Sequence, residues 1–218
     1  NLGSKDFLLA AESYCSNGQY QKGIDTFQLV ISKGLKTVSD SRQVGDRERP
    51  LLTALFKQAC AYQSSSKPDQ AVDALRSALN VYQTRFDKYK QIETEKLPFF
   101  FPTMSDIETK LAELLVAKKE YDSAILLLNS ATANISIALG ETSPFLAAPL
   151  TLLEQSYEAK GDHQEAKHAA IRMAKLSQHD HSTPQERTSD YQLMSRCNEL
   201  LKAKDFVALQ KLLDQHLT

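Results

Sequence analysis

The chain has 218 residues, of which 42% are hydrophobic and 24% are charged, the ordinary composition of a folded protein. Its 26 basic and 27 acidic residues give a formal net charge of −1, which excludes the basic excess that attracts nucleic acid or anionic lipid. Seven glycines and seven prolines are too few for the many tight turns of an all-β fold. No apolar run approaches the roughly 20 residues that cross a bilayer, so no membrane insertion is expected.

The first residue and the cysteines say less about the class of protein and its compartment. The chain begins with Asn1 instead of Met, which indicates a processed or excised piece. Cys15, Cys60 and Cys197 lie far apart, each inside a helical apolar pattern, and an odd number at this spacing indicates neither a disulfide framework nor a zinc site. We expect small buried thiols, with a redox role as the alternative. This favours a reducing, cytoplasmic compartment, although nothing else in the sequence specifies the localisation.

The first predicted element is a pair of helices at residues 4–36. Apolar residues at helical spacing precede and follow the turn Asn17–Tyr20, namely Phe7, Ala10, Ala11, Tyr14, Ile24, Phe27, Val30 and Ile31. The small residues Ala11 and Gly23 would let the two helices approach closely. The pattern therefore predicts an antiparallel helix pair.

The same arrangement recurs down the chain. Four further pairs are predicted at residues 50–96, 103–139, 144–178 and 184–218. In each pair one residue stands shortly after the turn, and we call these five the marker residues: Gly23, Ala71, Ala124, Ala166 and Leu209. Polar insertions are predicted at residues 37–49 and 85–103, with the helix before the second running to about Lys96 and stopping before Pro98.

These repeats resemble the tetratricopeptide repeat (TPR). Its pattern is a small residue, an aromatic residue three later, a Gly-Asp-Tyr-like turn and then the marker residue, and the first and fourth pairs match best. Residues 138–144 are similar to the lead-in of kinesin-light-chain-like repeats. There is no tryptophan, and the markers lie farther apart than the usual period of about 34 residues. The resemblance implies an all-α, right-handed superhelical solenoid of about five antiparallel helix pairs, forming one domain over residues 1–218.

The sequence offers no cluster that predicts catalysis. Gly-rich phosphate loops and the paired histidines of a zinc protease helix are absent. Residues 64–67 have serine–xx–lysine spacing, but they lie at an inter-helix turn and are interpreted as polar turn residues. His163, His168 and the His179–His181 segment are interpreted as solvated residues, with a metal site as the alternative. We therefore expect no enzyme, no metal and no cofactor.

An aromatic segment between two prolines is the least ordinary feature. Phe99, Phe100 and Phe101 lie between Pro98 and Pro102. Either these rings pack against the solenoid, or they form an exposed anchor for a partner, because exposed aromatic clusters usually mark interfaces.

The TPR resemblance also implies where a ligand would bind. In this family the first helix of each pair lines the concave face. Transferring that register predicts a groove built from Leu8, Glu12, Cys15, Phe56, Cys60, Gln63, Asp106, Thr109, Glu113, Val116, Thr151, Gln155 and Glu158. Leu8, Glu12 and Asp106 occupy places where the family's chaperone-tail binders carry Lys, Arg or Asn, so carboxylate capture is disfavoured.

The predicted groove is mixed apolar and acidic, which favours a neutral to basic segment, with a solvated acidic face as the alternative. The leading prediction is a protein–protein interaction module, an adaptor or scaffold that binds a polypeptide in this groove. The alternative is a regulatory or peptide-sensing TPR module excised from a larger multidomain protein. No nucleic-acid partner is expected, and the sequence does not indicate an oligomeric state.

Overall fold

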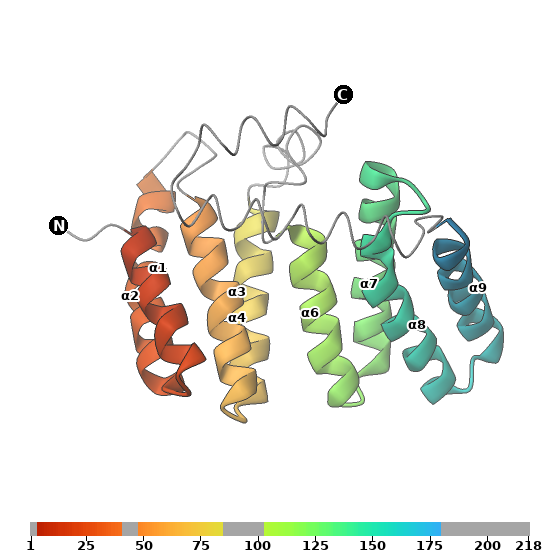
Figure 1. The fold of residues 1–218 in the computed structure, drawn as a ribbon, viewed down its shortest axis with the longest axis horizontal. Coiled ribbons are helices and arrows are strands. Elements are labelled where there is room, and N and C mark those ends of the chain that lie inside the picture. Colours follow the sequence, from red (N-terminus) through yellow and green to blue (C-terminus); the bar gives the residue numbers. More distant parts are fainter. Residues whose placement is uncertain (1–3, 41–47, 85–102, 180–218) are drawn as a thin grey trace, which may run out of the picture. The chain divides into compact units, whose positions relative to one another are not determined.

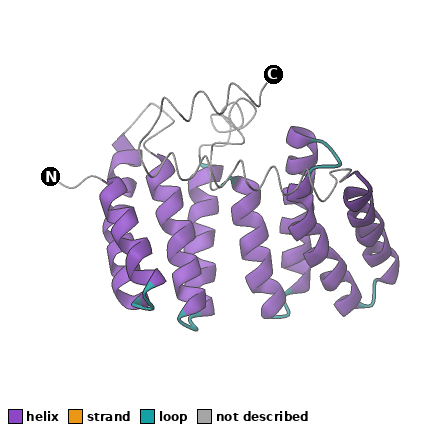
Figure 2. Ribbon diagram, viewed as in Figure 1, coloured by secondary structure: helices purple, strands orange, loops and turns teal. Residues whose placement is uncertain are grey.

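The computed structural model describes residues 4–40, 48–84 and 103–179. These ranges contain helices and connecting turns but no strand (Figure 2). Their elements are α1 Ser4–Ser16, α2 Tyr20–Asp40, α3 Glu48–Ser64, α4 Pro68–Gln83, α6 Met104–Ala117, α7 Tyr121–Leu139, the 3₁₀ helix η2 Pro144–Leu146, α8 Ala147–Lys160 and α9 His163–His179. The predicted all-α solenoid is confirmed.

The helices are arranged as stacked pairs. α1 packs on α2, α3 on α4 and α6 on α7, and neighbouring pairs meet through α2 with α3, α4 with α6 and α7 with α8 (Figure 1). The chain divides into two compact units, Asn1–Leu176 and Ser177–Thr218. Four predicted pairs thus lie in or reach the end of the first unit, and the fifth, at residues 184–218, lies outside the described residues.

Each pair turns through the same backbone conformation. The residue five before each marker has a positive φ, at Gly18, Ser66, Lys119 and Gly161. The next amide donates to a carbonyl five residues earlier, as in the bond of 2.9 Å from Gln19 N to Tyr14 O. This is the Schellman bond that satisfies the last carbonyls of a helix. It recurs at Lys67, Glu120 and Asp162, so all four predicted turns are confirmed.

Polar side chains link the turns of neighbouring pairs. Lys118 donates to Asp69 at 2.8 Å, and Lys160 is paired in the same way with Asp122. Both lysines stand six residues before a marker, and both aspartates stand two before one. Exposed pairs of this kind are worth only about 0–1 kcal/mol each. These ion pairs show instead that the repeats stack regularly, because the same positions are paired at two successive junctions.

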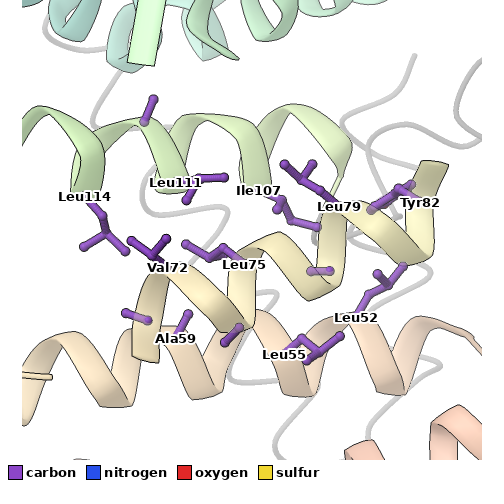
Figure 3. Close-up of a cluster of buried hydrophobic side chains, with 14 of the residues drawn as sticks. Leu52, Leu55, Ala59, Val72, Leu75, Leu79, Tyr82, Ile107, Leu111 and Leu114 are labelled. Carbon is purple, nitrogen blue, oxygen red and sulfur yellow. The ribbon is translucent and has the colours of Figure 1, made fainter. Parts of the chain in front are cut away.

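The apolar core runs between the pairs. In Figure 3, α4 lies between α3 and α6, with Leu75 and Leu79 among the buried residues that join the second pair to the third. Small residues are buried in this core as well, because Ala71, Ala112 and Ala124 are all 0% exposed. Burying a large apolar side chain contributes about 1.5–3 kcal/mol, so these contacts supply most of the stacking energy.

Two predicted boundaries differ from the structure. The insertion at residues 37–49 is shorter than expected, because α2 continues to Asp40 and α3 begins at Glu48. α4 ends at Gln83, and the predicted continuation to Lys96 lies outside the described residues.

α7 corrects the expectation that no segment approaches membrane-spanning length. Among the described helices it is long and apolar enough to cross a bilayer by length and composition. A helix that lines a protein core has the same composition, and one stripe of α7 is buried in the stack: Ala124, Ile125, Leu128, Ala131, Thr132 and Ile135.

Candidate functional site

The first helices of the pairs form one layer of the stack. α1 contacts α3 and α6 contacts α8 directly, whereas α2 and α4, or α4 and α7, share no comparable contact. The layer of first helices is therefore the tighter one, as expected for the inner side of a curved stack. We call its partly exposed residues the first-helix face: Leu8, Glu12, Cys15, Phe56, Lys57, Cys60, Gln63, Thr109, Lys110, Glu113, Val116 and Gln155.

Apolar side chains cross this face at half-buried positions. Leu8, Phe56 and Val116 each pack partly against the core, and each retains some exposure. They come from α1, α3 and α6, so three successive pairs contribute. A peptide lying across these helices would cover apolar surface that is only partly buried now.

The carboxylates of the face are paired with lysines that the sequence analysis missed. Glu12 Oε1 lies 3.7 Å from Lys57 Nζ, which joins α1 to α3. Glu113 accepts a hydrogen bond of 2.8 Å from Lys110 Nζ and one of 3.0 Å from Gln63 Nε2. The region from α1 to α6 is thus close to charge balance. Each lysine lies three residues before a predicted groove residue, and this spacing was the available signal.

Hydrogen bonding controls the ionisation of Glu113. Partial burial raises the pKa of this carboxyl, but the hydrogen bonds from Lys110 and Gln63 outweigh it and hold the pKa below its ordinary value of 4.5. Glu113 is therefore a carboxylate at neutral pH. Through Gln63 it also links the second pair to the third.

Two predicted acidic groove residues have local partners. Asp106 forms a capping box with Thr103: its Oδ2 accepts from Thr103 N at 2.7 Å, and Thr103 Oγ1 accepts from Asp106 N. Glu158 Oε2 lies 2.8 Å from His163 Nδ1 at the α8–α9 turn. Thr151 donates to Met173 of α9, within its own pair.

Two thiols lie in the middle of the face. Cys15 and Cys60 are free and partly buried, in α1 and α3. Burial raises the pKa of Cys15, and the charge of Glu12 and the neighbouring Cys60 thiol raise it further. Burial also raises the pKa of Cys60, and Lys110 and Lys57 only partly oppose this effect. Both groups are therefore thiols at neutral pH.

The other candidate sites gain no support from the described residues. Within the described ranges no three His, Cys, Asp or Glu residues come together as a metal site. Residues 64–67 form the α3–α4 turn, in agreement with the polar-turn interpretation. The aromatic segment Phe99–Phe101 and residues 180–181 lie outside the described residues.

Comparison with known proteins identifies the repeat. Residues 53–84 match the family model of the tetratricopeptide repeat. No curated protein matches the chain at a significant level. Among solved structures, the kinesin-light-chain-like, nearly identical TPR-like repeats of Podosopora anserina are 20% identical to this chain, with a TM-score of 0.60 over 97% of it and 92% of that chain. A variant of the same protein gives a TM-score of 0.61.

BtubC (BKLC) from P. vanneervenii has the same fold. It is 16% identical, with a TM-score of 0.65 over 97% of this chain and 77% of its own. Together with the matched repeat, these likenesses confirm the resemblance to TPR proteins of the kinesin-light-chain type. TPR repeats are in general protein–protein interaction modules, and this fold is typical of scaffolds rather than enzymes.

Proposed function

We propose that the chain is a non-catalytic adaptor whose first-helix face binds an extended polypeptide segment. The observation that carries this proposal is the set of half-buried apolar side chains at Leu8, Phe56 and Val116, contributed by three successive pairs. The same face carries amide and charged groups, namely Gln63, Gln155 and the two Lys–Glu pairs. Such a surface suits a segment that alternates apolar and polar contacts.

The proposed segment is neutral to basic. On the face between α1 and α6, Glu12 and Glu113 are each matched by a lysine, so this part of the face favours an uncharged stretch. Toward α8 the carboxylate of Glu158 is paired with the exposed His163, and a basic residue of the segment would be accommodated there. Balanced charge also implies slow, weakly salt-dependent association.

A peptide-display selection tests the proposal. Random peptides are selected on the wild-type chain and then measured on two variants that retain the core. Leu8→Ala with Gln155→Ala alters both ends of the face, while Ile137→Lys changes a residue of α7 that is 86% exposed and lies in a second helix. We expect the first variant to bind selected peptides at least 10-fold more weakly, about 1.4 kcal/mol, and the second to bind normally.

The opposite pattern would refute the proposal. Peptides that depend on Ile137 but not on Leu8 or Gln155 would place the binding surface on the second helices. Circular dichroism and urea unfolding of each variant, measured beside the binding, separate a loss of contact from a loss of fold.

A further inference from the structure

The two thiols of the first-helix face belong to α1 and α3. The equivalent positions in the next two first helices, α3 and α6, are in contact. Cys15 stands eight residues before the marker Gly23, and Gln63 stands eight before Ala71. Cys60 stands eleven before Ala71, and Glu113 stands eleven before Ala124. Cys15 and Cys60 therefore occupy the positions of Gln63 and Glu113, one pair earlier.

The later contact shows that these positions face each other. Gln63 Nε2 donates to Glu113 Oε1 at 3.0 Å, which joins α3 to α6. One helical turn before Cys15 and Cys60, Glu12 lies 3.7 Å from Lys57, so α1 and α3 pair in the same register as α3 and α6. α1 and α3 are also in direct contact, so shorter side chains can meet there.

Gly23 of α2 leaves room for the sulfur of Cys15 within its own pair. A Cβ atom on Gly23 would lie 2.3 Å from Cys15 Sγ, so the sulfur fills the space that the missing side chain leaves. Cys60 in turn lies near enough to influence the electrostatics of Cys15. Three observations, on register, helix contact and thiol proximity, agree.

We propose that Cys15 and Cys60 form a redox-sensitive dithiol site that a disulfide oxidant of the glutathione class converts to an α1–α3 disulfide. One cysteine thiolate attacks a sulfur of the oxidant, forms a mixed disulfide and releases one glutathione thiolate. The second cysteine thiolate then attacks the protein-bound sulfur and releases the second glutathione. Two electrons pass from the cysteine sulfurs to the two glutathiones, and the two thiol protons protonate the leaving groups.

The setting makes this oxidation slow at neutral pH and faster in alkali, because the thiolate is the attacking species. Around Cys60 the charged groups are Lys57 of its own helix and Lys110 and Glu113 of α6, and around Cys15 it is Glu12. If the first-helix face binds a peptide as proposed, the bond would tie together two helices of that face and make binding responsive to oxidation.

The experiment detects the Cys15–Cys60 disulfide directly and needs no peptide partner. The full chain carrying Cys197→Ser is incubated with oxidised glutathione at pH 8 to 9, an alkaline range chosen because ordinary thiols ionise at about 8.5, and is mapped by non-reducing peptide mass spectrometry. We expect a Cys15–Cys60 crosslink that dithiothreitol reverses.

The matched control moves one thiol by a single residue. Cys15→Ser with Ser16→Cys, again with Cys197→Ser, places the thiol about 100° around α1, on an exposed position. This variant should carry separate glutathione adducts, whereas in denaturant both chains should crosslink alike. Separate adducts on Cys15 and Cys60 in the native chain, or equal crosslinking of the native control, would overturn the proposal.

Discussion

Backbone conformation at the four turns shows how single residues shape this chain. Gly18 and Gly161 occupy the left-handed position at no steric cost, since they lack a Cβ atom. Ser66 and Lys119 occupy the same position with φ values of 59° and 63°. For residues with a side chain this conformation costs about 1–2 kcal/mol. The second and third turns therefore hold strain that the first and fourth avoid.

Lys119→Gly should relieve that strain. We expect the free energy of unfolding to rise by about 0.5–1 kcal/mol, because the gain in backbone energy exceeds the entropy that glycine adds to the unfolded chain. Urea denaturation would measure it. Lys119→Ala is the matched control, since it removes the long side chain but keeps the Cβ atom, and it should not stabilise. Equal effects of both substitutions would show that the side chain, not the φ angle, is responsible.

Asp106 carries two sequence signals, a local one and one from the family register. Thr103 and Asp106 have the spacing of a capping box, which satisfies two amides at the start of α6. This pattern is visible in the sequence, but the family register gave the same carboxylate a ligand-facing role. In the structure Asp106 makes the local capping bonds, and its place in the groove stays a prediction.

At the scale of elements, pairs and turns could be predicted because their signals are local. The apolar spacing on both sides of Asn17–Tyr20 or Lys118–Tyr121 lies within about 25 residues and depends on helical periodicity alone. Contacts between pairs join residues that are far apart in sequence, such as Gln63 and Glu113. Helical spacing indicates the Lys110–Glu113 pair, but it does not specify that Lys57 of α3 meets Glu12 of α1, so this second pair emerged only from the structure.

The packing of α7 is tested by enlarging one buried and one exposed alanine. Ala124 in α7 is 0% exposed, at the crossing of the third pair, whereas Ala133 of the same helix is exposed. Ala124→Leu should lower the free energy of unfolding by about 1–3 kcal/mol, since a close-packed contact cannot absorb the added volume. Ala133→Leu adds the same atoms to the same helix and should change stability by less than about 0.5 kcal/mol. Similar urea midpoints for the two variants would mean that Ala124 is not in a tight contact.

At the scale of the whole molecule, stability depends on how well neighbouring pairs are coupled. In a repeat fold each pair contacts only its neighbours, so one weak junction limits cooperativity. The second and third pairs meet through the apolar contact of α4 with α6 and through the Gln63–Glu113–Lys110 hydrogen bonds. Two carboxyls at this junction have a pKa that the folded contacts lower: Asp69, which Lys118 holds, and the less exposed Glu113.

That junction predicts how the stability of the stack depends on pH. The pKa of Glu113 is lower in the folded chain than its unfolded value of 4.5, so the unfolded chain binds more protons in this range. The contribution of Glu113 is complete above pH 4.5 and is lost as the pH falls through the folded pKa. Because the side chain is 43% exposed, solvent screening limits this contribution to about 0.5 kcal/mol.

Glu113→Gln tests this dependence, because it keeps an acceptor for Gln63 but removes the titration. The difference in unfolding free energy between wild type and variant should shrink as the pH is lowered from 6 to 3. Lys110→Met removes the main hydrogen bond that opposes burial, so the pKa of Glu113 rises toward its unfolded value and the stability that this group loses between pH 6 and 3 should be smaller. Urea unfolding at each pH measures both effects. If the wild type and Glu113→Gln lose stability in parallel down to pH 3, then Glu113 does not couple the second pair to the third.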